Sequence, residues 1–150
     1  MTTMDRSRST SEAASRLLAD SYAVYLKTHN FHWNVTGPMF TTLHGLFETQ
    51  YRELAEAVDE IAERIRALGH VAPGSYSELS RLSKVKDAAG ASPAEHMIRE
   101  LLADHALVRE TAAELFAAAE AADDPASADL AVRRIDASEK AAWMLRSHLE

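Results

Sequence analysis

The sequence predicts an all-α protein built as a four-helix bundle. Alanine, leucine and glutamate are abundant, whereas only five of the 150 residues are glycine, a composition that favours helices. Four long segments carry apolar residues at alternating steps of three and four, the spacing of one helix face. A chain of this length accommodates one domain with one hydrophobic core.

The first long helix is predicted to begin at the capping box Ser9-x-x-Glu12 and to end at about Val35. Residues 1–10 are expected to form a flexible tail, and residues 11–150 the folded domain. The apolar face of this helix has helical spacing and comprises Leu17, Leu18, Val24, Tyr25, Thr28, Phe31, His32 and Val35.

The second long helix follows the Gly37-Pro38 break and is predicted from about Phe40 to Leu68. Gly69 is expected to cap its carboxyl end. Its apolar positions follow steps of three and four without interruption: Phe40, Leu43, Phe47, Tyr51, Leu54, Val58, Ile61, Ile65 and Leu68.

A connection over residues 70–91 leads to the third long helix, and its capping box at Ser75 predicts a short extra helix over Tyr76–Leu82. Ser92 is expected to cap the third long helix, which runs to about Ala121. Asp124-Pro125 opens a fourth helix that continues to the end of the chain. The connection is long enough to cross from one end of the bundle to the other, which predicts a ferritin-like connection rather than an up-and-down array.

Composition restricts the function classes. The chain has no cysteine, which excludes disulfides and thiolate metal sites, and its formal net charge of −7 disfavours nucleic-acid binding but favours attraction of cations. The sequence has no run of about 18 apolar residues, so no membrane span is predicted. The first eleven residues are polar without a secretory signal, so a cytoplasmic location is expected.

Four side chains that can bind a metal ion lie together on the second helix, beside its apolar face. His44, Glu48, Asp59 and Glu63 fall within a sector of about 100°. Imidazole and carboxylate together suit divalent iron. No glutamate has a histidine three residues after it, so the usual di-iron site at the centre of a bundle is not encoded.

These four residues cannot bind one ion within one chain. His44 and Asp59 are about four helical turns apart, roughly 22 Å along the axis, whereas metal–ligand bonds are about 2 Å. An antiparallel second copy of the helix, related by a two-fold axis, would bring His44 and Glu48 opposite the Asp59 and Glu63 of its mate. His32 can reach the same end, since only a short break separates the two helices.

The residues alone leave a simpler interpretation open. His32 could be a hydrogen-bonded core histidine, and the helix carboxylates could form a solvated face paired with Arg52, Arg66 or Lys27. His29 is expected to have a structural role and His105 to lie in the core. His70, His96 and His148 are expected near the surface at helix ends.

Several segments resemble the Dps family, the DNA-protection-during-starvation proteins or mini-ferritins. These are His29–Pro38, Phe40–His44, Asp59–Ile65, Ala72–Tyr76 and Ala142–Ser147, and the resemblance covers roughly Leu17 to the end. It implies a ferritin-like bundle assembled as a hollow homododecamer. It also implies oxidation of Fe(II), preferably by hydrogen peroxide, and storage of the ferric mineral inside.

The resemblance assigns roles to individual residues. The metal site at the two-fold interface corresponds to His32, His44, Glu48, Asp59 and Glu63, holding one or two iron ions, with zinc as an alternative metal. Trp33 matches a tryptophan beside that site, where it could pack or take up oxidising equivalents. Asp124 and Asp129 correspond to acidic residues of the entry pores, although they could merely favour a helix N-terminus.

The chain departs from the lysine-rich tails through which many family members bind DNA. Its N-terminal extension has only Arg6 and Arg8 as cations. DNA binding is therefore expected to be weak, although several tails on one assembly could add avidity. The alternative function is a nucleoid-associated, DNA-compacting protein with incidental iron binding.

Overall fold

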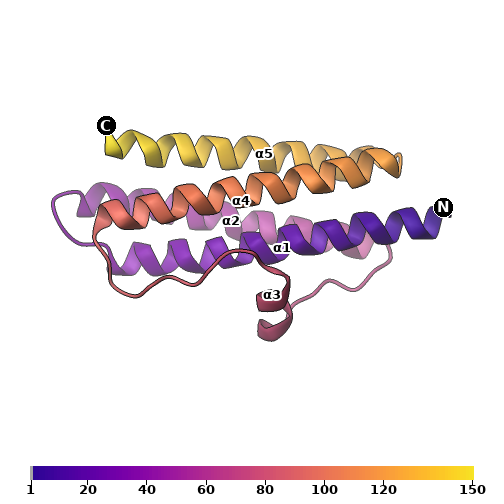
Figure 1. Cartoon of the computed structure of the whole chain (residues 1–150), viewed down its shortest axis with the longest axis horizontal. Helices are drawn as coiled ribbons and strands as arrows, with labels where there is room; N and C mark the ends of the chain where they lie inside the picture. Colours follow the sequence, from indigo (N-terminus) through magenta and orange to yellow (C-terminus); the bar gives the residue numbers. More distant parts are fainter. Residues whose placement is uncertain (1) are drawn as a thin grey trace.

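The computed structural model describes residues 2–150, and this part of the chain contains helices and no strands. The all-α prediction is confirmed. Residues 2–150 form four long helices and one short one, arranged as in Figure 1. Their bounds are α1 Thr3–Asn34, α2 Phe40–Ala67, α3 Tyr76–Leu82, α4 Ala94–Ala121 and α5 Pro125–Arg146, followed by a final 3₁₀ turn over Ser147–Leu149.

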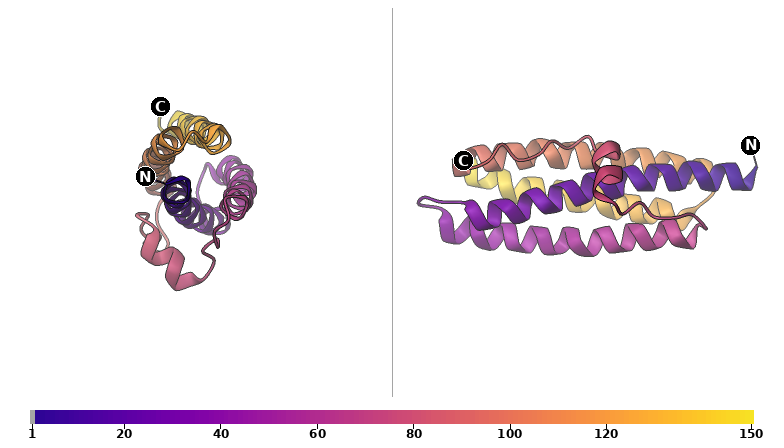
Figure 2. Two further views of the ribbon diagram at one scale, coloured as in Figure 1. Left: turned by 90° about the vertical axis from the view of Figure 1, so that its right-hand side faces the viewer. Right: turned by 90° about the horizontal axis from the view of Figure 1, so that it is seen from below.

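The four long helices lie side by side, and α3 packs outside them against α1 (Figures 1 and 2). α1 and α2 form one antiparallel hairpin, and α4 and α5 form the other. The connection between the hairpins runs the length of the bundle, so the predicted ferritin-like crossing is confirmed. No helix within residues 2–150 is both long and apolar enough to cross a membrane.

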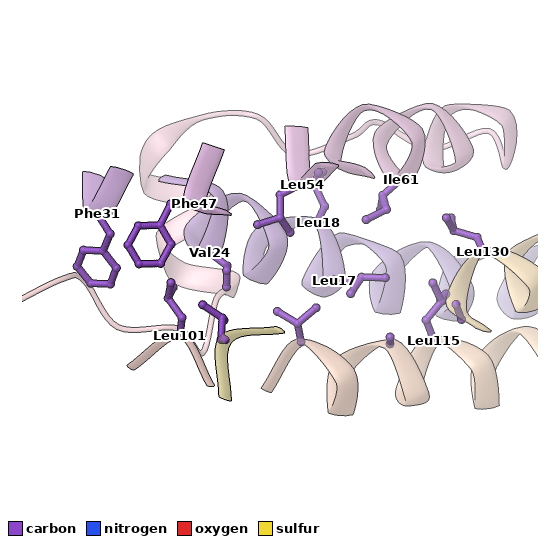
Figure 3. Close-up of a cluster of buried hydrophobic side chains, with 14 of the residues drawn as sticks. Leu17, Leu18, Val24, Phe31, Phe47, Leu54, Ile61, Leu101, Leu115 and Leu130 are labelled. Carbon is purple, nitrogen blue, oxygen red and sulfur yellow. The ribbon is translucent and has the colours of Figure 1, made fainter. Parts of the chain in front are cut away.

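The core runs along the bundle axis between the predicted apolar faces (Figure 3). Phe31 of α1 and Phe47 of α2 pack at one end, with ring centroids 6.2 Å apart. His105 of α4 is buried, as predicted. The predicted stripe of α2 is mostly buried, with Tyr51 and Val58 half-buried and Phe40 at its beginning exposed.

The predicted start of the first helix at Ser9 is wrong. α1 begins at Thr3, capped by a box in which the Thr2 hydroxyl accepts from the Asp5 backbone N–H at 3.1 Å. Residues 3–10, expected to be part of a flexible tail, are helical, and Met1 lies outside the described residues. The Ser7 hydroxyl donates to the carbonyl of Leu68 at 3.2 Å, which holds the added turns against the end of α2.

The cap of α4 also differs from the prediction. Pro93, with φ −59° and ψ 150°, takes the N-cap position itself, and the Ser92 hydroxyl makes no capping bond. Extended backbone at a proline satisfies the geometry of an N-cap, so the helix begins one residue later than the sequence signal suggested.

The predicted caps at Asp124, Gly69 and Ser75 are confirmed, whereas α5 ends at Arg146 and a 3₁₀ turn follows it. Asp124 caps α5 by accepting from the Ser127 N–H at 3.0 Å, with proline at the first helical position. Gly69, at φ +92°, ends α2 in a Schellman motif: its own N–H donates to the Arg66 carbonyl and the next N–H donates to Ile65. The short α3 has the predicted bounds, and the Ser75 hydroxyl accepts from the N–H of its third residue.

Candidate metal centre

The turn between α1 and α2 brings His32 and His44 together. Gly37, at φ +99°, reverses the chain in a conformation that other residues rarely adopt. The last turn of α1 and the first turns of α2 therefore lie face to face. The two imidazole rings stack with centroids 3.9 Å apart and an interplanar angle of 14°.

Each histidine ring is held by the backbone of the other. Nδ1 of His32 lies 2.7 Å from the His44 carbonyl oxygen, and Nδ1 of His44 lies 2.7 Å from the His32 carbonyl oxygen. A carbonyl oxygen only accepts hydrogen bonds, so Nδ1 carries the proton in both rings. In the neutral form of each ring, Nε2 then keeps its lone pair. This is the tautomer and the second-sphere bond typical of metal-binding histidines.

Glu48 adds a carboxylate one turn further along α2. Its Oε1 lies 3.8 Å from Nε2 of His32, and its Oε2 accepts from Arg52 at 3.2 Å. His32 is only 7% exposed, whereas His44 and Glu48 are half-buried. Two imidazole lone pairs and one carboxylate therefore meet at the edge of the chain, open on one side.

Asp59 and Glu63 do not join this group. α2 is one unbroken helix from Phe40 to Ala67, and both carboxylates lie exposed on its far half. Residues 2–150 contain no cluster of three or more His, Asp or Glu side chains placed to hold a metal ion within one chain. The structure thus divides the predicted site residues into two groups on opposite halves of one helix.

The cations proposed as simple partners for Asp59 and Glu63 are engaged elsewhere. Arg52 pairs with Glu48, and Arg66 donates to the His70 carbonyl. Lys27 is buried between carboxylates of α4. Local pairing with these cations therefore does not account for the two acidic side chains.

An aromatic wall borders the histidine pair. The His29 ring lies between Tyr51, with centroids 4.1 Å apart, and Trp33, with centroids 4.0 Å apart. Burial, together with the nearby His32 and Arg52, lowers the pKa of His29, so this ring packs as a neutral group. Trp33 itself is 59% exposed beside the site. Tyr51, assigned from the sequence only to the apolar stripe, also contacts this wall.

The acidic residues near the α4–α5 turn have local partners. Asp124 accepts from Ser127 and pairs with Arg64 at 2.9 Å. Burial alone would raise the pKa of Asp124, but these hydrogen bonds and the guanidinium outweigh it and lower the pKa. Asp129 is exposed and pairs with Arg133 at 2.9 Å. Capping by Asp124 is established, and pore lining by either residue stays a prediction.

Comparison with known proteins agrees with this geometry. Residues 11–150 match the ferritin-like domain family. DNA protection during starvation protein 2 of Bacillus anthracis is 37% identical over 138 residues, covering 92% of this chain and 94% of that protein.

Solved structures give the same result. A Dps protein from Bacillus brevis superposes with a TM-score of 0.94 at 31% identity, covering 100% of this chain and 99% of that one. A Dps protein from Vibrio cholerae, described as a member of a broad superfamily of ferritin-like diiron-carboxylate proteins, has a TM-score of 0.94 at 26% identity, covering 98% and 92%. The chain therefore belongs to the Dps family of ferritin-like proteins.

Proposed function

We propose that this protein oxidises Fe(II) with hydrogen peroxide at sites shared between two subunits and stores the ferric product inside a homododecamer. The observation that carries the proposal is the pair of Nδ1 hydrogen bonds by which His32 and His44 each bind the backbone of the other. These bonds leave two nearly parallel imidazoles with free Nε2 lone pairs at an open edge, next to Glu48. Such a half-site has a use only if further ligands come from outside the chain.

The missing ligands are the Asp59 and Glu63 of a second copy. An antiparallel two-fold pairing of α2 places the far half of one helix against the near half of the other, and it generates two equivalent sites. The combined set of imidazoles and carboxylates suits divalent iron as substrate, for one or two ions per site. Few protein ligands leave open positions for water and peroxide.

The reaction balances without release of a radical. Two Fe(II) ions each lose one electron, and one hydrogen peroxide accepts both electrons with two protons to give two water molecules. The residues of this chain bind and orient the substrate ions, and the Nδ1 bonds keep both rings from rotating away. Trp33 packs beside the site, within reach of oxidising equivalents that escape it.

Stopped-flow measurement of ferric product tests the proposal. Replacement of His44 by alanine should slow peroxide-driven oxidation at least tenfold while the assembly keeps its mass, because one of the few ligands is lost. His96→Ala, which removes an exposed histidine of α4, serves as the matched control and should keep the wild-type rate. Equal rates for the two variants would remove His44 from the mechanism.

The Bacillus anthracis relative takes its name from the protection of DNA during starvation. For this chain we propose that protection comes from removal of Fe(II) and peroxide rather than from DNA binding. The net charge is −7, and Arg6, one of the two N-terminal arginines, lies 3.8 Å from Asp123. A gel-shift series across salt concentrations should show binding only at low salt. Binding that persists near physiological salt would favour the DNA-compacting alternative.

A further inference from the structure

A layer of buried polar side chains crosses the middle of the bundle, away from the metal centre described above. Three of the long helices contribute to it: Gln50 of α2, His105 of α4 and Arg134 of α5 are buried, and the half-exposed Glu53 of α2 pairs with Arg134. Four of the eight buried side-chain atoms without a hydrogen-bond partner in residues 2–150 belong to this layer. They are Gln50 Oε1, both ring nitrogens of His105 and Arg134 Nε.

Unpartnered polar atoms inside a protein destabilise the folded state, because they have lost their hydrogen bonds to water. His105 is the extreme case, because it is 3% exposed and neither ring nitrogen has a partner. A second polar atom of the same kind, Gln50 Oε1, belongs to the helix opposite. The Gln50 carboxamide oxygen and the one imidazole nitrogen of His105 that carries no proton are acceptors of the type that bind cations.

The positive charge in this layer is a guanidinium. The Arg134 side chain is 6% exposed, and its Nη2 donates to Glu53 at 3.0 Å while Nη1 contacts the other oxygen of the same carboxylate. The charges of Glu53 and Arg134 both act on His105. Burial and Arg134 together outweigh Glu53 and lower the pKa of His105 to about 4, so the imidazole is neutral and retains one free lone pair.

The donor types match those of a divalent cation site. Gln50 and Glu53 are three residues apart on one helix, as are the paired ligands of metal sites in helical bundles, and the charge of Glu53 acts on His105, which is buried on another helix. Imidazole, carboxylate and carboxamide oxygen are all ligands of first-row divalent metals. The guanidinium satisfies the Glu53 carboxylate by donating hydrogen bonds to it. Because it is a cation that only donates, it must leave before a metal ion can bind to the same carboxylate.

We propose that Gln50, Glu53 and His105 form a latent divalent-cation site in the bundle centre, and that Arg134 occupies it and excludes metal ions. Arg134 is then a specificity-determining residue. It keeps metal ions out of the interior of the chain and leaves the α1–α2 end as the place where they bind. Removal of the guanidinium should expose the donor set to a divalent ion.

Cobalt(II) titration provides the test, because protein-bound Co(II) absorbs in the visible region. The variant Arg134→Met should bind one more Co(II) per chain than wild type, with new visible bands. Arg133→Met is the matched control: the neighbouring arginine carries the same charge but pairs with the exposed Glu60 at the surface. It should show no added binding. In the double variant with His105→Leu, the extra ion should be lost.

Calorimetric titration with Zn(II) and circular dichroism complete the design. If Arg134→Met unfolds without metal, refolding on addition of Zn(II) supports the proposal, and Arg134→Gln, which keeps a polar side chain, is titrated alongside. Equal Co(II) binding by Arg134→Met, Arg134→Gln and Arg133→Met would overturn the proposal. It would also be overturned if Arg134→Met stayed unfolded in the presence of Zn(II) and Arg134→Gln bound no additional metal ion. Every variant keeps His32 and His44, so the result is independent of the proposed ferroxidase function.

Discussion

The shared site makes a quantitative prediction about mixed assemblies. His44 and Asp59 lie on one continuous helix, roughly 22 Å apart along its axis, so each site must take its histidines from one chain and its acids from another. Assemblies made only of His44→Ala chains, or only of Asp59→Ala chains, should oxidise Fe(II) near the background rate. Co-assembly of the two variants should restore activity, since some sites then combine an intact His44 with an intact Asp59.

The expected recovery follows from random pairing at the two-fold axis. With equal amounts of the two chains, a site has a one-half chance of an intact His44 and an independent one-half chance of an intact Asp59 from its mate. About a quarter of all sites are therefore complete. Wild type mixed with the double variant carrying both alanines should also give about a quarter of wild-type activity, because both ligand groups must again come from wild-type chains.

Sites contained within one chain would behave differently. They would give no recovery in the first mixture and about half of wild-type activity in the second. The assay is the initial rate of ferric product formation in stopped flow after addition of peroxide, with subunit composition checked by mass spectrometry and assembly by size-exclusion chromatography. A first mixture no faster than the mean of its two parents would refute the shared-site reasoning.

Three further predictions concern stability, measured by urea unfolding at fixed protein concentration. Lys27→Met should destabilise the fold by about 3–5 kcal/mol, because it leaves buried carboxylates without their cation. Burial raises the pKa of Asp104, so Asp104→Asn should leave the unfolding free energy at pH 7 unchanged or increase it. A large loss of stability in Asp104→Asn would contradict this. Burial lowers the pKa of His105 to about 4, so between about pH 6.5 and pH 4 the unfolded chain binds a proton that the folded chain does not. Wild type should therefore lose roughly 3 kcal/mol of unfolding free energy as the pH falls over this range, and His105→Leu should not show this loss. Asp124→Ala removes a helix cap and should cost about 1–2 kcal/mol, whereas Asp129→Ala, which removes an exposed pair, should cost under about 1 kcal/mol.

The helix start at Ser9 shows where sequence reasoning reached its limit. Thr2 with Asp5 and Ser9 with Glu12 are equivalent capping signals, and local chemistry cannot choose between them. The choice came from packing: Thr10 and Ser11 are buried, and the Ser7 hydroxyl bonds to the end of α2. At Ser92 the limit was different, since proline itself adopted the capping conformation.

The candidate site was predictable in part. Spacing on one helix, together with the Gly-Pro break, was sufficient to group His32 with His44 and to separate them from Asp59. The reciprocal Nδ1 bonds were not predictable, because each depends on a backbone carbonyl that faces the ring only in the closed hairpin. The polar layer around His105 was missed for the same reason: its members lie on three different helices and have no common sequence motif.

The sequence by itself determined the helices, the apolar faces, the crossing connection and the residue types available to a metal ion. These follow from periodicity and from local capping chemistry, which act within a few residues of each other. Only the tertiary structure decided which imidazole nitrogen is free, which acids have partners and where a guanidinium lies in the core. Those properties depend on contacts between residues far apart in the chain, and such contacts exist only after the helices have packed.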